Sequence, residues 1–319
     1  MSPYNNILGN KAIQTALAGA LGVACWFGGV QYEKSKHPNV IRPVPSSLPV
    51  AKPAPAASVA QKPQVPAISE NRLEAVGRRT SEIMKFGFPS LSNIRSFDDF
   101  VLSYDNRNRV ANWVFEHLTE ENLKVANNVD RAKCDFTVDK SIHPFFRSTN
   151  EDYKRSGFDR GHLAAAGNHR LQQQHCDQTF TLSNIAPQVG VGFNRDAWNN
   201  LERYVRNLTK KYSDVYVCTG PIYKPISEGG KRYIKYQVIG ENQVAVPTHF
   251  FKVVVMVTYD DQLHMECYLM PNQAIPDSTP LTTFLVPLET IQKLSGLLFF
   301  DGTSAEKLKS INGKKSSFW

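Results

Sequence analysis

The sequence predicts an α+β fold with a mixed, largely antiparallel sheet and flanking helices. Helix-like and strand-like stretches alternate without an internal repeat, and clusters of glycine, proline and asparagine separate the strand-like stretches. The chain has 319 residues, of which 41% are hydrophobic and 21% are charged. These proportions suit a globular protein with a sizeable core and exclude wholesale disorder or a collagen-like fibre.

The expected elements begin near Glu70, where residues 70–74 open a helix-like segment with alternating charge. Strands are expected where apolar residues run between turn-rich clusters such as residues 105–108. The expected strands cover residues 100–104, 111–117, 214–219, 233–239, 250–259 and 264–270. Two further helices are expected over residues 197–211 and 287–294.

The first 69 residues differ in composition from the rest. Residues 12–30 carry no charge and are about long enough to span a membrane, although Gln14, Thr15 and four glycines weaken such a span. A secretory signal, a mitochondrial signal and a membrane anchor all fit this stretch. Seven prolines within residues 43–66 predict an extended, semi-rigid tether. We therefore expect four parts: a leader or anchor (1–42), a proline-rich linker (43–69), a folded domain (70–300) and a basic tail (301–319).

The net charge of +8 makes an anionic partner plausible. Residues 1–69 hold six basic residues against one acid, Glu33, so most of the excess lies outside the expected folded domain. Composition alone is therefore a poor argument for nucleic-acid binding, and motifs must decide. The five cysteines occur singly, without a CxxC pair, which predicts isolated buried thiols rather than a disulfide framework or a zinc site.

Residues 157–202 hold a dense polar cluster that an apolar core does not need. Its centre is Asp159-Arg160-Gly161-His162. Arg160 offers a permanent cation with a planar set of donors suited to phosphate oxygens, and His162 can accept a proton near neutral pH. Gly161 permits a close backbone approach.

Cleavage of a phosphodiester needs a base to activate water, positive charge near the phosphorus and neutralisation of the departing oxygen. A hard cation such as Mg²⁺ suits the last task and takes oxygen ligands. Asn194, Trp198 and Glu202 recur every four residues, so a helix there would carry an amide and a carboxylate on broadly one face.

Each of these residues also has a purely structural interpretation. Asp159 and Arg160 could form an ion pair, and His162 could be a buried, hydrogen-bonded imidazole. Asn194 could cap the following helix, which is the commoner role of asparagine in that position. Glu202 could belong to a solvated helix face. Their joint occurrence favours the catalytic interpretation.

Taken together, the motifs resemble the DNA/RNA non-specific endonucleases of the ββα-metal class. The resemblance covers about residues 70–300 and is carried by residues 159–162, Leu182-Ser183-Asn184, Pro187-Gln188 and residues 194–202. Aspartate rather than serine before Arg160 favours the mitochondrial endonuclease branch of that family over its exonuclease-like branch. The resemblance implies a ββα-metal motif at the active site.

The resemblance implies His162 as general base and Asn194 as the direct protein ligand to Mg²⁺ or Mn²⁺. Arg160 and Glu202 would assist in the transition state and through metal-bound water, with Asn184 a supporting polar residue. The implied reaction is sequence-non-specific cleavage of DNA and RNA, single- or double-stranded, to 5′-phosphate and 3′-hydroxyl ends.

Further basic residues are candidates for phosphate contacts. Arg131 and Arg147 precede the motif in a polar region, where surface solvation is an equal alternative. A second group follows the expected metal ligand on the same helix and could guide the nucleic-acid backbone, or simply form a solvated face: Arg203, Arg206, Lys210 and Lys211.

The family also implies partners and a location. It implies a homodimer and a leader that addresses the chain to the mitochondrial intermembrane space or anchors it in the inner membrane, with relocation to the nucleus during cell death. The rival function is a non-catalytic nucleic-acid binder on the same scaffold, against which His162, Arg160, Asn194 and Glu202 are all present. A membrane-tethered structural protein would account for residues 1–66 alone.

Overall fold

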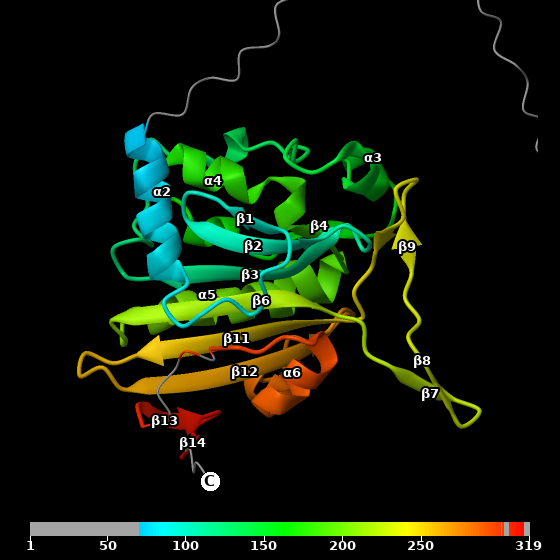
Figure 1. Ribbon diagram of the computed structural model, residues 1–319. Helices are drawn as coiled ribbons and strands as arrows, with labels where there is room; N and C mark the ends of the chain where they lie inside the picture. Colours follow the sequence, from blue (N-terminus) through cyan, green and yellow to red (C-terminus); the bar gives the residue numbers. More distant parts are fainter. Residues whose placement is uncertain (1–69, 301, 303–305, 316–319) are drawn as a thin grey trace, which may run out of the picture. The chain divides into compact units, whose positions relative to one another are not determined.

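The computed structural model describes residues 70–300, 302 and 306–315 (Figure 1). The expected leader and linker, residues 1–42 and 43–69, lie outside the described residues, as do parts of the expected tail. No helix in the described part of the chain is long and apolar enough to cross a membrane.

Eight strands form one sheet in the spatial order β1-β2-β3-β6-β11-β12-β13-β14 (Figure 1). Neighbouring strands are antiparallel except β12 and β13, which run parallel. The prediction of a mixed, largely antiparallel sheet is therefore confirmed. The strands are β1 (Ile94–Ser96), β2 (Phe100–Asp105), β3 (Val110–Leu118), β6 (Asp214–Ile222), β11 (His249–Val257), β12 (Leu263–Pro271), β13 (Leu308–Ile311) and β14 (Lys314–Lys315).

The long central strands are apolar on both faces. Because successive side chains of a strand point to opposite faces, the sheet builds two cores. On one face, Phe250 and Val254 of β11 belong to the core that includes the residues of α5. On the other face, Phe251 packs in a core with Ile83 of α2 and Ile291 of α6. Helices thus cover both faces of the sheet.

The helices expected over residues 70–74, 197–211 and 287–294 are found as α2, α5 and α6. The α-helices are α2 (Glu70–Ile83), α3 (Asn150–Tyr153), α4 (Gln173–Thr179), α5 (Trp198–Leu208) and α6 (Leu288–Ser295). Short 3-10 turns occur at η2 (Arg131–Lys133), η3 (Pro144–Phe146), η4 (Ala166–Asn168), η5 (Leu182–Asn184) and η7 (Leu281–Phe284).

Two expectations need correction. The prediction of a single strand over residues 233–239 is wrong. This stretch contributes to two separate two-stranded sheets that do not pair with the main sheet. One pairs β7 (Ile226–Glu228) with β8 (Lys231–Tyr233), and the other pairs β9 (Val238–Ile239) with β10 (Val244–Ala245). Within the expected tail, β13 and β14 extend the sheet, with Leu308 buried beside β12. The sheet therefore continues past residue 300.

A second, two-stranded sheet leads into α5. Strand β4 (Asp159–His162) pairs antiparallel with β5 (Ile185–Gln188), and a π-helical turn, η6 (Gly190–Ala197), connects β5 to α5. Gly161 lies so close to Gln188 that a Cβ there would overlap the side-chain amide. Gly192 has a φ of +83° inside the turn, a conformation that other residues rarely adopt. These two glycines allow the strand, the turn and the helix to meet.

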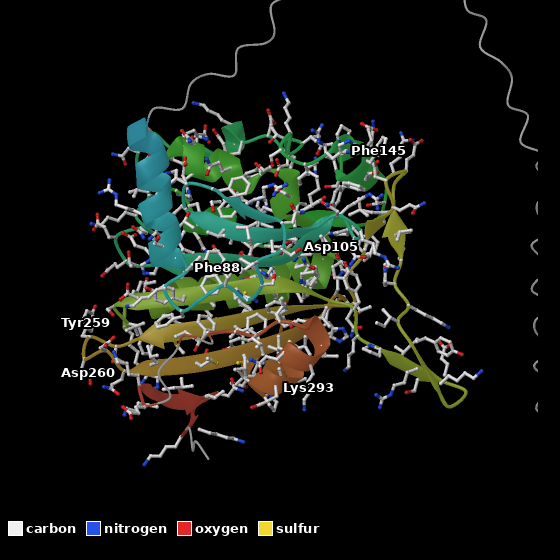
Figure 2. The ribbon with its side chains drawn as sticks, viewed as in Figure 1. Phe88, Asp105, Phe145, Tyr259, Asp260 and Lys293 are labelled. Carbon is white, nitrogen blue, oxygen red and sulfur yellow. The ribbon has the colours of Figure 1, made fainter. Side chains whose placement is uncertain are left out.

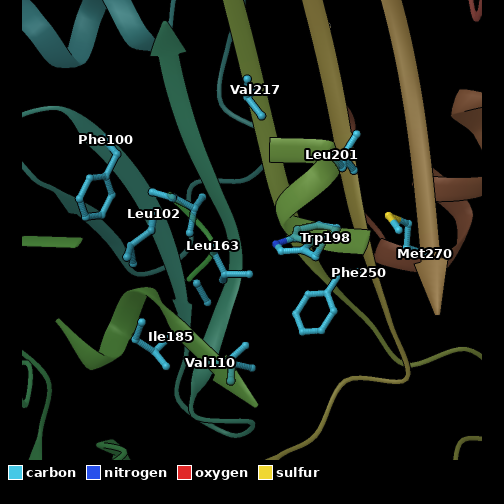
Figure 3. Packing of buried hydrophobic residues seen from close by; sticks show 14 of the residues in the cluster. Phe100, Leu102, Val110, Leu163, Ile185, Trp198, Leu201, Val217, Phe250 and Met270 are labelled. Carbon is cyan, nitrogen blue, oxygen red and sulfur yellow. The ribbon is translucent and has the colours of Figure 1, made fainter. Parts of the chain in front are cut away.

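An aromatic cluster fixes this unit to the main sheet. The ring of Trp198 lies 5.6 Å from Phe193 and 5.7 Å from Phe250, and Phe193 stacks on Phe250 at 5.8 Å. All three side chains are buried. Figure 3 shows Trp198 and Leu201 of α5 facing Phe250 of β11.

We expect Phe250→Ala to lower the free energy of unfolding by about 3–5 kcal/mol, because it leaves a cavity where α5 meets β11. Urea unfolding measures this loss. The control is Tyr259→Ala in the turn between β11 and β12, where the side chain is 80% exposed (Figure 2). That variant should stay within about 0.5 kcal/mol of wild type. Equal losses in both variants would contradict the anchoring role of Phe250.

Candidate active site

A polar cavity of about 410 Å³ opens where β4, η2, η4, η6 and α5 meet. The predicted base His162 and the predicted metal ligand Asn194 both line it, as do three of the five arginines predicted to contact phosphate. The cavity is lined by Arg131, Phe136, Arg160, His162, Ala165, Ala166, Gly167, Phe180, Asn194, Arg195, Asn199, Glu202 and Arg206.

His162 ends strand β4 between two aromatic rings. Its ring centroid lies 4.6 Å from Phe180, edge to face, and 5.6 Å from Phe136. Its buried Nε2 atom has no hydrogen-bond partner among the described residues. Burial, reinforced by the positive charges of Arg131 and His169, lowers the pKa of His162 to about 3. The imidazole is therefore neutral at physiological pH and can accept a proton.

Asp159 fixes the orientation of Asn194. The Asn194 amide Nδ2 donates to Asp159 Oδ2 at 3.0 Å, so its Oδ1 is left for the cavity. Arg195 donates to the same carboxylate from Nε at 2.8 Å and Nη2 at 2.6 Å. Hydrogen bonding from Arg195 is the main reason that the pKa of Asp159 is lowered. Asp159 therefore pairs with Arg195, and the alternative of an Asp159–Arg160 ion pair is not realised.

Arg160 is exposed and held by two contacts. Its Nη1 donates to Asn150 Oδ1 at 2.8 Å, and its guanidinium lies 4.1 Å from the centre of the Phe136 ring. The contact with the ring stabilises the cation without consuming a negative charge. Arg160 lines the same cavity as His162.

Glu202 faces the cavity from α5, two turns after Asn194. It makes no ion pair with any described residue. Burial raises the pKa of Glu202, while the charges of Lys252 and Arg206 oppose that shift. The carboxylate oxygens of Glu202 therefore remain available in the cavity that Asn194 also lines.

These donors fit a hard divalent cation. An amide oxygen and a carboxylate are the ligands that Mg²⁺ takes, and it keeps several waters when a protein supplies few ligands. No group of three or more histidine, cysteine or acidic side chains with metal-binding geometry occurs among the described residues. The site thus suits a cation held mainly by water, Asn194 and Glu202 rather than a caged metal.

Arg206 is hydrogen-bonded to a buried polar network formed by Asn168, Glu116, His169 and Asp99. Arg206 Nη1 donates to Asn168 Oδ1 at 2.9 Å, and Asn168 Nδ2 donates to Glu116 Oε1 at 2.8 Å. His169 bridges two carboxylates, with Nε2 at 2.9 Å from Glu116 Oε1 and Nδ1 at 2.9 Å from Asp99 Oδ2. Burial alone would lower the pKa of His169, but these two carboxylates outweigh it and raise the pKa to about 9.

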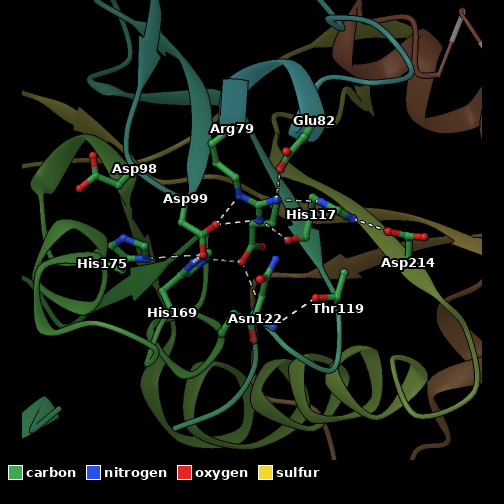
Figure 4. Close-up of polar contacts among 12 residues, drawn as sticks. Arg79, Glu82, Asp98, Asp99, His117, Thr119, Asn122, His169, His175 and Asp214 are labelled. Atoms are coloured by element: carbon green, nitrogen blue, oxygen red, sulfur yellow. Dashed lines mark hydrogen bonds and ion pairs between the residues drawn. The ribbon is translucent and has the colours of Figure 1, made fainter. Parts of the chain in front are cut away.

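The network continues to helix α2 (Figure 4). Arg79 Nε donates to Asp99 Oδ1 at 2.7 Å, and its Nη2 donates to the carbonyl of His117 at 2.9 Å. His117 in turn lies 2.7 Å from Asp214 Oδ1 through its Nε2. Charged and polar side chains thus connect helix α2 to Arg206 in the cavity.

Two expected site residues lie elsewhere, which corrects their predicted roles. Asn184 is fully buried and does not line the cavity. Its Oδ1 accepts from the Ala164 backbone N–H at 2.9 Å, and its Nδ2 donates to the carbonyls of Ala164 at 3.0 Å and Thr179 at 2.8 Å. It holds the chain that leaves His162. Arg147 uses its guanidinium on the carbonyls of Ile142 and Lys140, outside the cavity.

Of the basic residues that follow Glu202, one lines the cavity and the others do not. Arg206 lines the cavity, whereas Arg203 is exposed on α5 and does not. Lys210 and Lys211 are exposed beyond the end of α5 at Leu208. Arg131 lines the cavity as expected.

Sequence reasoning assigned no role at the site to Phe136, Phe180 or Asn199. Asn199 lies three residues before Glu202 on α5, a spacing that places two side chains on neighbouring positions of a helix surface and could have identified it. The two phenylalanines come from separate segments that only tertiary packing brings to His162.

A neutral histidine beside oxygen donors for a cation and several arginines is suited to hydrolysis of a phosphodiester. The class of protein that the fold and the site define is therefore a nuclease of the ββα-metal type, in which β4, β5 and α5 form the motif.

The chain belongs to the DNA/RNA non-specific endonuclease family, whose sequence profile matches residues 79–306. Among its relatives, mitochondrial endonuclease G of Caenorhabditis elegans is 52% identical over 238 residues, covering 74% of this chain and 77% of the relative. Mitochondrial endonuclease G of Homo sapiens is 53% identical over 219 residues, covering 68% and 73%. These matches confirm the resemblance seen in the motifs, and the protein is an endonuclease.

A solved structure gives the same result. The chain matches a structure described as a complex of EndoG with EndoGI with a TM-score of 0.73 and 63% identity. The match covers 74% of this chain and 97% of that one. The α+β fold with its largely antiparallel sheet is therefore that of an endonuclease G.

The contacts of His169 predict a pH-dependent contribution to stability. Because its pKa is near 9 in the folded state and about 6.5 when unfolded, the contribution is complete below about pH 6.5 and is lost as the pH rises toward 9. The free energy of unfolding in urea should fall across that window in wild type. His169→Gln should show a flatter dependence, and equal slopes would contradict a charged His169.

Proposed function

We propose that the cavity hydrolyses phosphodiester bonds of DNA and RNA, single- or double-stranded, to 5′-phosphate and 3′-hydroxyl ends without sequence preference. The observation that carries this proposal is the neutral His162 in one cavity with Asn194, Glu202 and Arg206. In the proposed mechanism, His162 is the general base. Arg131, Arg160 and Arg206 surround the phosphate group of the substrate.

The steps follow from where the residues lie. Arg131, Arg160 and Arg206 bind the non-bridging phosphate oxygens and offset the charge that builds up at phosphorus. His162 takes the proton of the attacking water as its oxygen bonds to phosphorus. The P–O3′ bond then breaks, the departing O3′ takes a proton from solvent water to become the 3′-hydroxyl, and His162 returns its proton to solvent.

The residues fit a divalent cation at the departing oxygen. Asn194 would hold Mg²⁺ or Mn²⁺ directly and Glu202 through coordinated water. Such a cation, when bound, supplies the charge that stabilises the departing oxygen. The chain's own contribution is to fix the Asn194 amide through Asp159, and to leave Glu202 without an ion pair to any residue that the structure describes.

The lack of sequence preference follows from the kinds of contact. Arginines that bind phosphate oxygens give affinity without reading bases. Arg203, Lys210 and Lys211 are exposed around the end of α5 and would extend this contact along the backbone of the nucleic acid. We propose this extended role for them although they lie outside the cavity.

For the cellular setting we propose a mitochondrial protein, in the intermembrane space or at the inner membrane, able to relocate to the nucleus. The names of the relatives and the composition of residues 1–42 support the mitochondrial part. We also propose that a leader and a proline-rich linker precede the folded domain, which begins near residue 70 and includes β13 and β14. A homodimer is supported by apolar side chains exposed on and beside the β7–β8 hairpin: Ile226, Tyr233, Ile234 and Val238.

We expect His162→Ala to lower the rate of plasmid cleavage by about 10²- to 10⁴-fold, because the base that activates water is lost. Asn194→Ala should require more Mg²⁺ for any given rate, and a chelator should stop wild-type cleavage. Agarose gels of DNA and RNA incubated with or without Mg²⁺ measure these effects.

The same gels separate an enzyme from a non-catalytic binder. A binder would retard nucleic acid without degrading it in every lane. Undiminished cleavage by His162→Ala would remove His162 as the base. Circular dichroism of each variant shows whether a loss of cleavage comes from unfolding.

Arg131→Gln and Arg206→Gln should each weaken nucleic-acid binding and reduce the slope of log affinity against log salt by about 1, because each removes one phosphate contact. Fluorescence anisotropy with a labelled oligonucleotide measures the slope. The control is Lys293→Gln on α6, an exposed position on the opposite face of the sheet from α5 (Figure 2). An unchanged slope in both arginine variants would contradict the assignment.

A further inference from the structure

Two cysteines that are 42 residues apart in sequence meet beside the cavity. Cys134 Sγ lies 3.2 Å from Cys176 Sγ, and both are free thiols. The expectation of isolated thiols is therefore wrong for this pair. Cys218 and Cys267, by contrast, are buried in the core on the other face of the sheet. Cys134 is partly exposed, so a small oxidant in solution can reach the pair.

The two sulfurs come from segments that line the active site. Cys134 directly follows η2, which carries Arg131, and precedes Phe136, on whose ring Arg160 rests. Cys176 lies on α4, and Phe180 at the end of that helix contacts His162. Phe136 and Phe180 also pack on each other at 4.9 Å. A bond between the sulfurs would therefore join both aromatic walls of the cavity.

The geometry needs only a small movement. A disulfide has a sulfur separation of about 2.05 Å, so the atoms must approach by about 1 Å. Cys176 is fully buried in α4 and surrounded by packed side chains. Because Cys134 is the more exposed partner, the movement falls on η2 and the segment toward Phe136.

We propose that Cys134 and Cys176 form a reversible disulfide under peroxide, and that this bond lowers nuclease activity by displacing Arg131 and Phe136 from His162. The site of modification stands on the sulfur contact alone. The effect on activity rests on the function proposed above. Catalytic groups displaced by about 1 Å can cost as much as 10²-fold in rate.

The oxidation balances with a peroxide as the oxidant. The Cys134 sulfur attacks a peroxide oxygen, the O–O bond breaks, and a sulfenic acid forms with release of one water. The Cys176 sulfur attacks the sulfenic sulfur, the S–S bond forms and a second water leaves. Hydrogen peroxide is thereby reduced to two waters, and the two thiols lose two electrons and two protons. A dithiol reverses the bond by exchange.

The surroundings make this reaction slow at neutral pH. Burial, with Cys176 and the carboxylate of Asp177 adding to it, raises the pKa of the Cys134 thiol well above its usual range. The reactive thiolate is therefore scarce near pH 7 and increases with alkaline pH. The pair responds to sustained oxidation rather than to brief exposure.

The test uses the full chain, incubated with hydrogen peroxide at about pH 7 and at about pH 8.5. Remaining thiols are blocked, and peptides are mapped by mass spectrometry without reduction. We expect a linked Cys134–Cys176 peptide that forms faster at the higher pH. Plasmid cleavage should fall about tenfold or more as it forms, and dithiothreitol should restore it.

Matched variants assign the effect. Cys176→Ala should show no linked peptide and keep its activity in peroxide, and Cys134→Ser provides the same test if Cys176→Ala fails to fold. Cys267→Ala, which removes a distant buried thiol, should respond as wild type does. If Cys176→Ala lost activity in peroxide as fast as wild type, the pair would not cause the loss.

Two further results would overturn parts of the proposal. If no linked peptide formed under excess peroxide at either pH, the modification site would be wrong. If the peptide formed while cleavage was unchanged, the effect on activity would be wrong. A reduced protein that cleaved nothing would instead count against the proposed function, since the linked peptide is detected independently of activity.

Discussion

The carboxylate of Asp159 joins the strand that carries His162 to the turn that carries Asn194. By accepting the Asn194 amide nitrogen, it leaves only the amide oxygen for a cation. Arg195 occupies the rest of the carboxylate, which keeps Asp159 charged and in place. The backbone of Gly190 also lies close to this carboxylate, since a Cβ at that position would be 3.0 Å from both Asp159 oxygens. Asp159 therefore fixes the Asn194 amide relative to the strand that carries His162.

The sheet and α5 could be predicted because apolar residues recur along each of these segments with a regular period. That His162, Asn194 and Glu202 line one cavity could be predicted because they lie in one polar segment of the sequence. Residues 233–239 have the same apolar character as a strand, but the presence of a pairing partner is a tertiary property. Asn184 and Arg147 could not be placed, since a side chain that bonds the backbone has the same residue type as one that binds a ligand.

Some arginines of this protein form structural ion pairs, whereas others keep a charge that is available to a phosphate group. Arg79 connects helix α2 to the sheet through Asp99, and Arg195 binds Asp159. The charge of each of these arginines is therefore paired with a carboxylate of the protein itself. Arg206 receives support through Asn168, which accepts from its guanidinium rather than neutralising it. Arg160 rests on an aromatic ring. Arginines supported by neutral groups keep their charge available for phosphate, whereas those paired with carboxylates do not.

The aromatic walls around His162 have a consequence for its strength as a base. Phe136 and Phe180 exclude water, and the cations Arg131 and His169 oppose protonation, so the imidazole holds a proton weakly. A phosphodiester anion beside Arg131 cancels part of that positive field and raises the proton affinity of the ring. The basicity of the histidine is thus coupled to occupancy of the cavity by an anion, which favours the role of base proposed for it.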